Sequence, residues 1–514
     1  MTAPPESLRV GRRRGPAGET SRELRTTRSR ALPRETVLAL AGIGALVGIA
    51  LRIWALSGYI STLDSDEAVV GLMGRHFLHG EHTVFFWGQS HGGSVEAIIA
   101  AAIFAVVGSS SLALKAVPLL LDSVAAVLVW RIGIRVLDRR LALAAAVLFW
   151  IWPATYVFWS TKERGFYYAC LVLGLVVLLC TLRLVEKPDR WVDWAVLGLA
   201  AGLGWWTSPQ IMYYVIPAAA WLLFRVPLAL WRAPVSLLTA FLGAWPWTRY
   251  NLDHHWESLV VPPGLVHGTY WDHLVTFFTQ ALPMAVGTMT PYSYRWVVPS
   301  VGPLLYLGVL VILGFAFRRP AGMGLVLLFA AAYPFIHAIS PLSQFVDEAR
   351  YLVYLSPALA LLGIAALRRG PAIGAAMAGA LALTVIALGV LAEPPRASGG
   401  SVPIPASMTS LVRDLEQRGV HHAFGIYWIA YRLTFESREQ VVAASTDTVR
   451  YPPFQDQVRS AGDVPAWVFA AGSADGDDFE RRLRKKGVTY DRRDVGGFRV
   501  FLPASRILPE DLPG

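Results

Sequence analysis

Residues 166–184 read FYYACLVLGLVVLLCTLRL, a run of nineteen residues in which Arg183 is the one charge. A helix of this length covers about 28 Å, which matches the roughly 30 Å hydrocarbon core of a bilayer. Similar runs recur along the 514 residues, so that 54% of the chain is hydrophobic and only 16% is charged. A soluble domain has about a quarter charged residues. The chain is therefore predicted to be mainly a polytopic α-helical membrane protein.

Eleven stretches are predicted to cross the membrane, some of them shortened by proline or glycine. They are residues 36–57, 112–134, 141–158, 166–184, 193–207, 210–225, 233–249, 300–317, 322–339, 351–367 and 372–392. Every second connection is short and basic, with Arg131, Arg135, Arg139 and Arg140, then Arg183, Lys187 and Arg190, Arg225 and Arg232, Arg318 and Arg319, and Arg368 and Arg369. Basic loops mark the cytoplasmic side. We therefore predict a cytoplasmic N-terminus and an outer C-terminus.

The two ends of the chain differ from the apolar body, residues 35–392. Residues 1–34 hold nine arginines against three glutamates, and they are predicted to form a basic cytoplasmic tail. Because this excess charge lies beside a membrane segment, it gives little support to nucleic-acid binding. Residues 393–406 are rich in Gly, Ser and Pro and are predicted to be a linker.

Residues 407–514 are predicted to form an extracytoplasmic α/β domain. Helices are expected at 407–417 and 477–486, and strands at 423–427, 440–444, 467–470, around Tyr490 and at 499–502. The first outer loop, residues 58–111, is expected to hold a short interfacial helix that begins near Asp64 or Ser65 and runs to His79. Residues 95–107 are apolar but too short to span, so they are predicted to be re-entrant or interfacial.

Three polar clusters, far apart in sequence, map to the predicted outer face. They are Asp64, Asp66 and Glu67 with Arg75, His91 and Glu96; Lys162, Glu163 and Arg164; and Asp347, Glu348, Arg350 and Tyr351. Each cluster alone is also explained by a helix cap or a solvated boundary. Ionisable groups near the membrane are costly unless paired, so a shared cavity is the simpler interpretation. There a carboxylate can deprotonate a hydroxyl, while Lys and Arg hold a phosphate.

Four motifs carry a resemblance to a known family. They are LDSDEA at 63–68, GQSHGG at 88–93 followed by Glu96, WSTKERG at 159–165, and EARY at 348–351. Together with the long first loop, they resemble the membrane-embedded GT-C glycosyltransferases, in particular the bacterial group related to protein O-mannosyltransferases and to the aminoarabinose transferase of lipid A. The resemblance covers residues 36–392, and an outer C-terminal domain is usual in many bacterial members.

The resemblance implies transfer of a sugar from a polyprenyl-phosphate donor on the outer face of the bacterial cytoplasmic membrane. Asp66 would be the general base, and Glu67 would assist it or order the site. Lys162 and Arg164 would meet the lipid phosphate, with Arg350 as a second contact. The other predicted substrate-binding residues are Asp64, His91, Glu96, Glu163, Asp347 and Tyr351. A divalent metal ion at Asp66 and Glu67 is left open, and no other cofactor is expected. The acceptor, whether lipid, glycan or protein, is not written in any motif.

Two alternatives come from other classes of protein. A secondary transporter would also have many spans, but it often shows repeated halves with broken helices and charges near the bilayer midplane. The chain shows no such internal symmetry, and its charges gather at one face. A non-catalytic membrane scaffold could keep the fold without the activity, and only an assay separates it from an enzyme.

Overall fold

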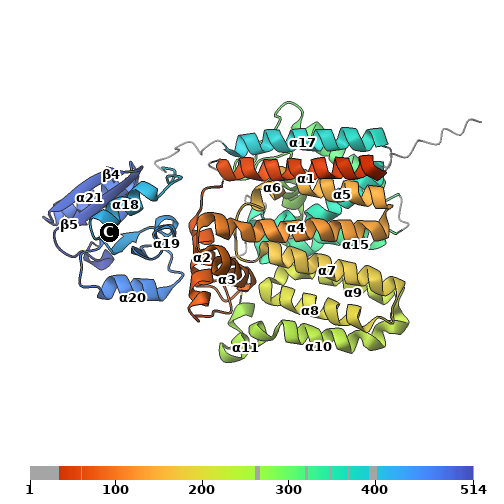
Figure 1. Ribbon diagram of the computed structural model, residues 1–514, viewed down its shortest axis with the longest axis horizontal. Coiled ribbons are helices and arrows are strands. Elements are labelled where there is room, and N and C mark those ends of the chain that lie inside the picture. Colours follow the sequence, from red (N-terminus) through yellow and green to blue (C-terminus); the bar gives the residue numbers. More distant parts are fainter. Residues whose placement is uncertain are drawn as a thin grey trace, which may run out of the picture.

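The computed structural model describes residues 34–58, 61–260, 267–318, 322–346, 350–367, 370–392 and 402–512. These residues form a long helical bundle with a smaller sheet domain at one end (Figure 1). Helices α2 (Ser65–Leu78) and α3 (Val95–Val107) lie between the two. The first was predicted as a short helix of the first outer loop, and the second as a re-entrant or interfacial apolar stretch of the same loop. The predicted tail, except for its last residue, and residues 393–401 of the predicted linker lie outside the described residues.

The bundle helices follow the predicted spans. They are α1 (Arg34–Ser57), α4 (Ser111–Val136), α5 (Arg139–Ile151), α6 (Ala154–Trp159), α7 (Tyr167–Glu186), α8 (Trp191–Thr207), α9 (Met212–Arg225), α10 (Ala233–Gly243), α11 (Trp245–Asp253), α14 (Gly302–Ala316), α15 (Gly324–Ile339), α16 (Ser356–Leu367) and α17 (Gly370–Ala392). The 3-10 turn Arg350–Leu355 leads into α16. Two short helices, α12 (Tyr270–Thr276) and α13 (Leu282–Ala285), complete this part of the chain.

Within the part of the chain that the structure describes, five segments are long and apolar enough to cross a membrane by themselves: Glu35–Ser57, Ser111–Val136, Tyr167–Glu186, Arg350–Leu367 and Gly370–Ala392. A sixth candidate joins Pro209–Arg225 to Pro227–Gly243, and the chain bends by 118° between these two pieces. Other predicted spans are shorter or interrupted, because Pro153 separates α5 from α6 and Ala244 separates α10 from α11. The total of eleven crossings therefore stays a prediction.

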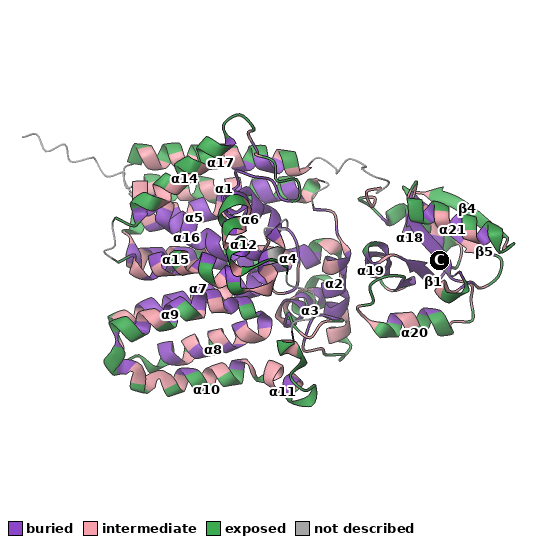
Figure 2. Cartoon of the chain, turned by 180° about the vertical axis from the view of Figure 1, so that it is seen from behind, coloured by how far each residue is buried: buried purple, intermediate pink, exposed green. Residues whose placement is uncertain are grey.

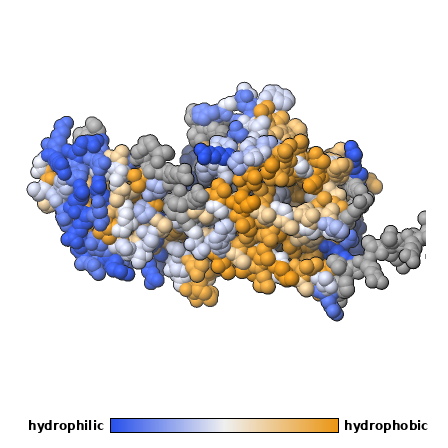
Figure 3. All heavy atoms as spheres, turned by 90° about the horizontal axis from the view of Figure 1, so that it is seen from above, coloured by the Kyte–Doolittle hydropathy of each residue, from blue (hydrophilic) through white to orange (hydrophobic). Residues whose placement is uncertain are grey.

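The surface of the bundle is apolar, in contrast to that of the sheet domain (Figure 3). Leu46 of α1, Leu237 of α10 and Leu304 of α14 expose 67%, 70% and 67% of their surface. Figure 2 shows exposed residues along the outward sides of α14 and α17. Exposed leucines on the helices of the bundle fit a lipid environment, because this large apolar surface would be in unfavourable contact with water in a soluble protein.

Small residues bring α8 and α10 together. A Cβ atom at Gly198 would lie 2.0 Å from the carbonyl oxygen of Ser236, and one at Gly202 would lie 1.9 Å from that of Ala240. Both distances are far inside van der Waals contact, so neither position accepts a larger residue in this packing. Close backbone approach through small residues is typical of helix pairs in membranes.

The sheet domain has five strands in the order β2-β1-β3-β5-β4. The strands are β1 (His422–Gly425), β2 (Val442–Ser445), β3 (Ala466–Ala470), β4 (Tyr490–Val495) and β5 (Phe498–Pro503). β1 pairs in parallel with β2 and β3, whereas β5 pairs antiparallel with β3 and β4. Helices α18 (Thr409–Gln417), α19 (Tyr427–Glu436), α20 (Pro452–Ser460) and α21 (Ala474–Lys485) accompany the sheet. The predicted α/β character is confirmed.

The prediction of a strand over 423–427 is wrong at its end, and α19 and α20 were not predicted. β1 ends at Gly425, and Tyr427 opens α19. This helix is buried on nearly all sides, since it packs against the sheet and against α2. Its run of aromatic and apolar residues therefore lacks the one-sided pattern that marks a surface helix.

Candidate active site

The first acidic segment forms the start of α2. Asp64 is the N-cap of this helix, and its carboxylate accepts a hydrogen bond from the backbone nitrogen of Glu67 at 3.2 Å. The Glu67 carboxylate in turn accepts from the backbone nitrogen of Asp64 at 3.3 Å. This reciprocal capping box confirms the predicted cap and fixes the direction of the Asp64 and Glu67 side chains.

Glu67 is fully buried and holds two lysines. Its Oε1 lies 2.7 Å from Nζ of Lys115, and its Oε2 lies 3.0 Å from Nζ of Lys162. The backbone nitrogen of Glu163 also donates to Oε1 at 3.1 Å. The buried Glu67 carboxylate depends on both lysines, because removing one of them would leave part of its negative charge uncompensated. Glu67 therefore ties the start of α2 to α4 and to the segment before α7.

Asp66 is partly exposed and contacts both the membrane domain and the sheet domain. Its side chain keeps 19% of its surface exposed. Oδ2 lies 2.5 Å from Arg164 and 3.8 Å from Arg350, while Oδ1 accepts a hydrogen bond from the hydroxyl of Tyr427 at 2.5 Å. The three predicted clusters thus converge on one carboxylate, together with a residue of the sheet domain.

Asp64 shares Arg164 with Asp66 but has Lys162 as its second cationic partner. Its Oδ2 lies 2.9 Å from Arg164 and 3.2 Å from Lys162. Although burial disfavours the charge, Arg164 and Lys162 together hold the pKa of Asp64 well below its ordinary value. Because Asp64 also caps α2, it suits a structural role better than a catalytic one.

A cavity of about 460 Å³ opens beside this cluster. Asp64, Lys162 and Arg164 form its charged wall, and Trp159 belongs to its apolar lining. The sheet domain contributes Trp428 and Arg432, and the end of α17 contributes Val390 and Leu391. Asp66 itself does not line the cavity and is reached across Arg164. The cavity therefore offers charged groups and an apolar surface to one ligand.

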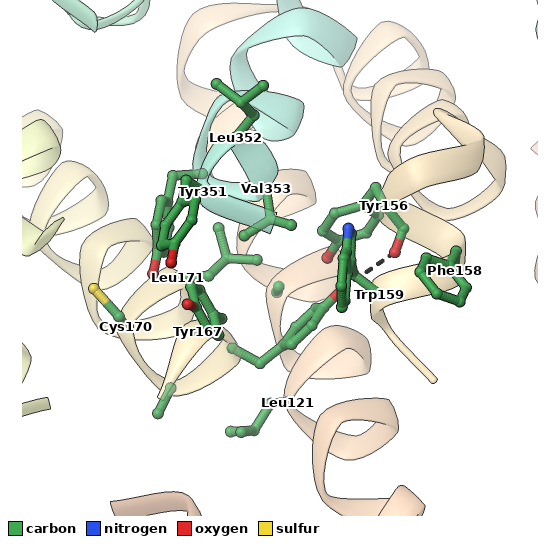
Figure 4. Packing of buried hydrophobic residues seen from close by; sticks show 14 of the residues in the cluster. Leu121, Tyr156, Phe158, Trp159, Tyr167, Cys170, Leu171, Tyr351, Leu352 and Val353 are labelled. Carbon is green, nitrogen blue, oxygen red and sulfur yellow. Dashed lines mark hydrogen bonds between the residues drawn. The ribbon is translucent and has the colours of Figure 1, made fainter. Parts of the chain in front are cut away.

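Aromatic rings support the arginines of the site, and Figure 4 shows three of these rings, those of Trp159, Tyr167 and Tyr351. The guanidinium of Arg164 lies 5.4 Å from the ring centre of Trp159, and that of Arg350 lies 5.6 Å from Tyr167 and 5.2 Å from Tyr351. Tyr167 and Tyr351 come from different helical segments and pack edge to face. These contacts stabilise the arginines by cation–π attraction and fix their direction.

Glu96 and Glu163 form a second carboxyl pair behind the first acids. Both are buried, and each carboxyl group affects the pKa of the other. Burial, reinforced by Glu96, raises the pKa of Glu163 well above its ordinary value, and burial likewise raises the pKa of Glu96. Two adjacent buried carboxyl groups hold a proton between them. Since Glu163 also accepts from the nitrogen of Gly165 at 2.8 Å and Glu96 from that of Ala169 at 2.7 Å, the pair fixes the segment that carries Lys162 and Arg164.

The remaining predicted residues have different positions. His91 is exposed and faces the charge of Arg450 in the sheet domain. Its motif serves packing, because Gly88 has a φ of +66° and a Cβ there would lie 2.8 Å from the Cα of Arg450. Tyr351 is buried and accepts a hydrogen bond from Arg350 at 3.2 Å. Asp347 and its neighbour Glu348 lie outside the described residues.

The residues of the site that were not predicted include Lys115 and Tyr427. Lys115 lies inside α4, where one cation in an apolar span is itself a sign of function. That signal was present in the sequence. Tyr427 lies within the region predicted as a strand, and it meets Asp66 across 361 positions of the chain. No local pattern indicates such a contact.

The side chains present do not fit a divalent metal ion at Asp66 and Glu67. Among the described residues, no group of three or more His, Cys, Asp or Glu side chains is placed to hold a metal. The carboxylate oxygens of Asp66 and Glu67 already contact Arg164, Lys115, Lys162 and Tyr427. Cationic partners at these oxygens would repel a second cation.

Comparisons with known proteins agree with this architecture. A family model described as dolichyl-phosphate-mannose-protein mannosyltransferase matches residues 93–247, which is less than a third of the chain. No curated protein matches the sequence. The crystal structure of ArnT from Cupriavidus metallidurans bound to undecaprenyl phosphate is similar, with a TM-score of 0.65 and 14% identity over 91% of this chain and 98% of that chain.

The structural comparison matches two further structures. ArnT from Cupriavidus metallidurans in the apo state has a TM-score of 0.61, with 14% identity over 91% of this chain and 98% of that chain. The oligosaccharyltransferase of Archaeoglobus fulgidus in complex with Zn and sulfate has a TM-score of 0.47, with 13% identity over 92% of this chain and 74% of that chain. At these identities, the likeness to ArnT establishes a shared fold.

Proposed function

We propose that this chain, which has the GT-C fold of membrane glycosyltransferases, transfers a sugar from a polyprenyl-phosphate donor to an acceptor hydroxyl. The reaction would take place on the outer face of the bacterial cytoplasmic membrane. The alternating basic loops support this side, because the site lies at the connections between the basic ones. The acceptor is a lipid, a glycan or a protein that carries a free hydroxyl group.

Asp66 acts as the general base in this proposal. It removes the proton of the acceptor hydroxyl, and the acceptor oxygen bonds to the anomeric carbon of the sugar. The bond between that carbon and the phosphate oxygen breaks, and its electron pair leaves with the polyprenyl phosphate. Attack opposite the leaving group inverts the anomeric centre. Of the three acids, Asp66 combines an exposed surface with a carboxylate that is not part of the capping box.

Arg164 stabilises the charge that the departing phosphate gains. A guanidinium has five N–H donors, and Arg164 uses one terminal nitrogen on Asp66 and the other on Asp64. Donors remain for a phosphate in the cavity that Arg164 lines. The cavity is lined by three cations, Lys162, Arg164 and Arg432, and by one acid, Asp64. This excess of positive charge at the cavity favours an anionic ligand.

Glu67 has a supporting role in this proposal. It is fully buried and holds Lys115 and Lys162 on opposite oxygens, so it has no free oxygen for an acceptor. By fixing Lys162 it orders the phosphate wall. The single observation that carries the proposal is the meeting of Asp66, Arg164 and Arg350 beside a cavity that is charged on one side and apolar on the other.

The proposal is tested with the purified full chain in detergent. Undecaprenyl phosphate is the binding probe, and Arg164→Lys is the variant, because lysine keeps the charge but loses the planar fork. We expect roughly tenfold weaker binding in the variant, since a charge-assisted contact to phosphate contributes about 1.5 kcal/mol or more. Arg131→Lys, at the exposed basic end of α4, is the matched control and should bind as the wild type does.

Transfer is measured with a set of undecaprenyl-phosphate sugars that carry a labelled sugar, with native membranes as the acceptor source. Transfer that depends on Arg164 supports the proposal. Binding of undecaprenyl phosphate without transfer of any sugar would favour the non-catalytic scaffold. Movement of a labelled solute across vesicles, with no binding of undecaprenyl phosphate, would favour a transporter.

A further inference from the structure

The sheet domain reaches into the acidic site through one side chain. Tyr427 is the first residue of α19, and its hydroxyl donates to Oδ1 of Asp66 at 2.5 Å. Arg164 and Arg350 approach the other oxygen, Oδ2. The two oxygens of Asp66 are thus held from opposite sides, one by the membrane domain and one by the sheet domain.

The backbone of Tyr427 is held from both domains. Its carbonyl oxygen accepts from the hydroxyl of Ser65 at 2.6 Å, and its backbone nitrogen donates to Asp447 at 2.6 Å. The residue is 4% exposed, and the guanidinium of Arg450 lies 5.5 Å from its ring centre. A side chain that must leave to admit substrate would not be fixed at both main-chain groups. The contact therefore has the character of a fixed support.

The helix that carries Tyr427 is docked tightly on α2. A Cβ atom at Gly71 would lie 2.4 Å from the ring of Phe435, so the two helices touch where glycine leaves room. Arg75 donates to the carbonyl oxygen of Phe435 at 2.8 Å and lies 3.5 Å from Glu439. The position of Tyr427 relative to Asp66 is thus set by several contacts along both helices.

The phenol of Tyr427 is suited to donate a hydrogen bond to Asp66. Burial, together with the charge of Asp66, raises the pKa of Tyr427 far above its ordinary value, so the phenol keeps its proton. A carboxylate oxygen has two lone pairs, and Tyr427 occupies one of them on Oδ1. The second lone pair of Oδ1 remains for a hydrogen bond from the acceptor hydroxyl, so that Tyr427 can keep its own bond to Asp66.

We infer that Tyr427 is a positioning residue for Asp66, through which the C-terminal sheet domain completes the active site of the membrane domain. The inference rests on the proposed function, because it assigns a partner to the proposed general base. Its consequence is that the sheet domain contributes to turnover as well as to the cavity wall.

Tyr427→Phe tests the inference, with Tyr431→Phe on the same helix as its matched control. The Tyr431 hydroxyl accepts from the backbone nitrogens of Arg450 and Tyr451 at 2.6 and 2.8 Å, so its loss leaves two N–H groups unpaired. We expect Tyr427→Phe to lower the rate of labelled sugar transfer about tenfold to a hundredfold, while the affinity for undecaprenyl phosphate and the melting temperature stay near wild type. Tyr431→Phe should show the reverse, a lower melting temperature with turnover per folded molecule kept.

The same change in the Asp66→Asn background separates this inference from the proposed function. If Tyr427 acts through Asp66, Tyr427→Phe has little further effect once the base is gone. Transfer at the wild-type rate in Tyr427→Phe overturns the inference and leaves the proposed function intact. Faster transfer does the same, because it would mean that the tyrosine hydroxyl blocks access of the substrate to Asp66. An equal loss with and without Asp66 also overturns it. Absence of transfer in the wild type, with every donor sugar tried, counts against the proposed function instead.

Discussion

Two clusters in this protein contain an arginine, an aspartate and a tyrosine, and their surroundings give them different roles. Inside the bundle, Nε of Arg52 lies 3.0 Å from Asp122, whose other oxygen accepts from the hydroxyl of Tyr156. At the end of the bundle, Asp66 meets Arg164 and Tyr427. The residue types are the same, but the inner cluster is closed and the outer cluster is open.

The inner cluster has no capacity left for a ligand. Arg52 and Asp122 expose 3% and 0% of their side chains, and Arg52 also donates to the carbonyl oxygens of Gly48 and Trp150 at 2.9 Å. Its ion pair thus joins α1 to α4. In the outer cluster Asp66 remains 19% exposed, and Arg164 lines the cavity. Burial and saturation of donors therefore distinguish an ion pair that holds the fold from one that can act on a substrate.

The largest effect on stability is expected at the inner cluster. Arg52→Ala leaves Asp122 buried without its cation, which should lower the free energy of unfolding by about 3–5 kcal/mol. Thermal unfolding in detergent measures this loss, and Arg131→Ala at an exposed position is the control. A melting temperature for Arg52→Ala equal to that of the control would show that the inner ion pair does not hold the fold.

A smaller loss is expected for Lys115→Met. This change removes one of the two cations of Glu67, and Lys162 remains at the other oxygen. We expect a loss of about 2 kcal/mol in the free energy of unfolding, because the buried carboxylate keeps part of its compensation. Adding Glu67→Gln should recover part of that loss, since it removes the unpaired charge. A double variant less stable than Lys115→Met would contradict this account of Glu67.

The smallest expected effect is a pH dependence from Glu163. The folded-state pKa of Glu163 is raised by burial and by Glu96, so its contribution to stability is complete below its ordinary pKa of 4.5. That contribution is lost as the pH rises through the raised folded-state pKa. The melting temperature of the wild type should therefore fall with rising pH, and Glu163→Gln should make the curve flatter. Parallel curves for the two proteins, scanned from about pH 5 to 9, would argue against a shared proton.

The sequence predicted the local features of the site better than its long-range contacts. The cap at Asp64 depends on residues three positions apart, and the basic segment at Lys162 and Arg164 precedes a clear apolar helix. The role of Tyr427 depends on how two domains dock, which hydropathy and periodicity do not encode. The break between α5 and α6 at Pro153 was also not predicted, because a proline in a span can be accommodated or can end the helix, and the packing around it decides which.

The central claim is that Asp66 serves catalysis whereas Asp122 serves the fold, and the two aspartate-to-asparagine variants test it most directly. Turnover per folded molecule is measured with the labelled undecaprenyl-phosphate sugar that the wild type accepts. Asp66→Asn should lower turnover by roughly 10² to 10⁴, with undecaprenyl phosphate still bound and the melting temperature nearly kept. Asp122→Asn should lower the melting temperature and leave turnover per folded molecule near wild type. Full turnover in Asp66→Asn would contradict the account, because asparagine keeps the shape of the side chain but does not accept the proton.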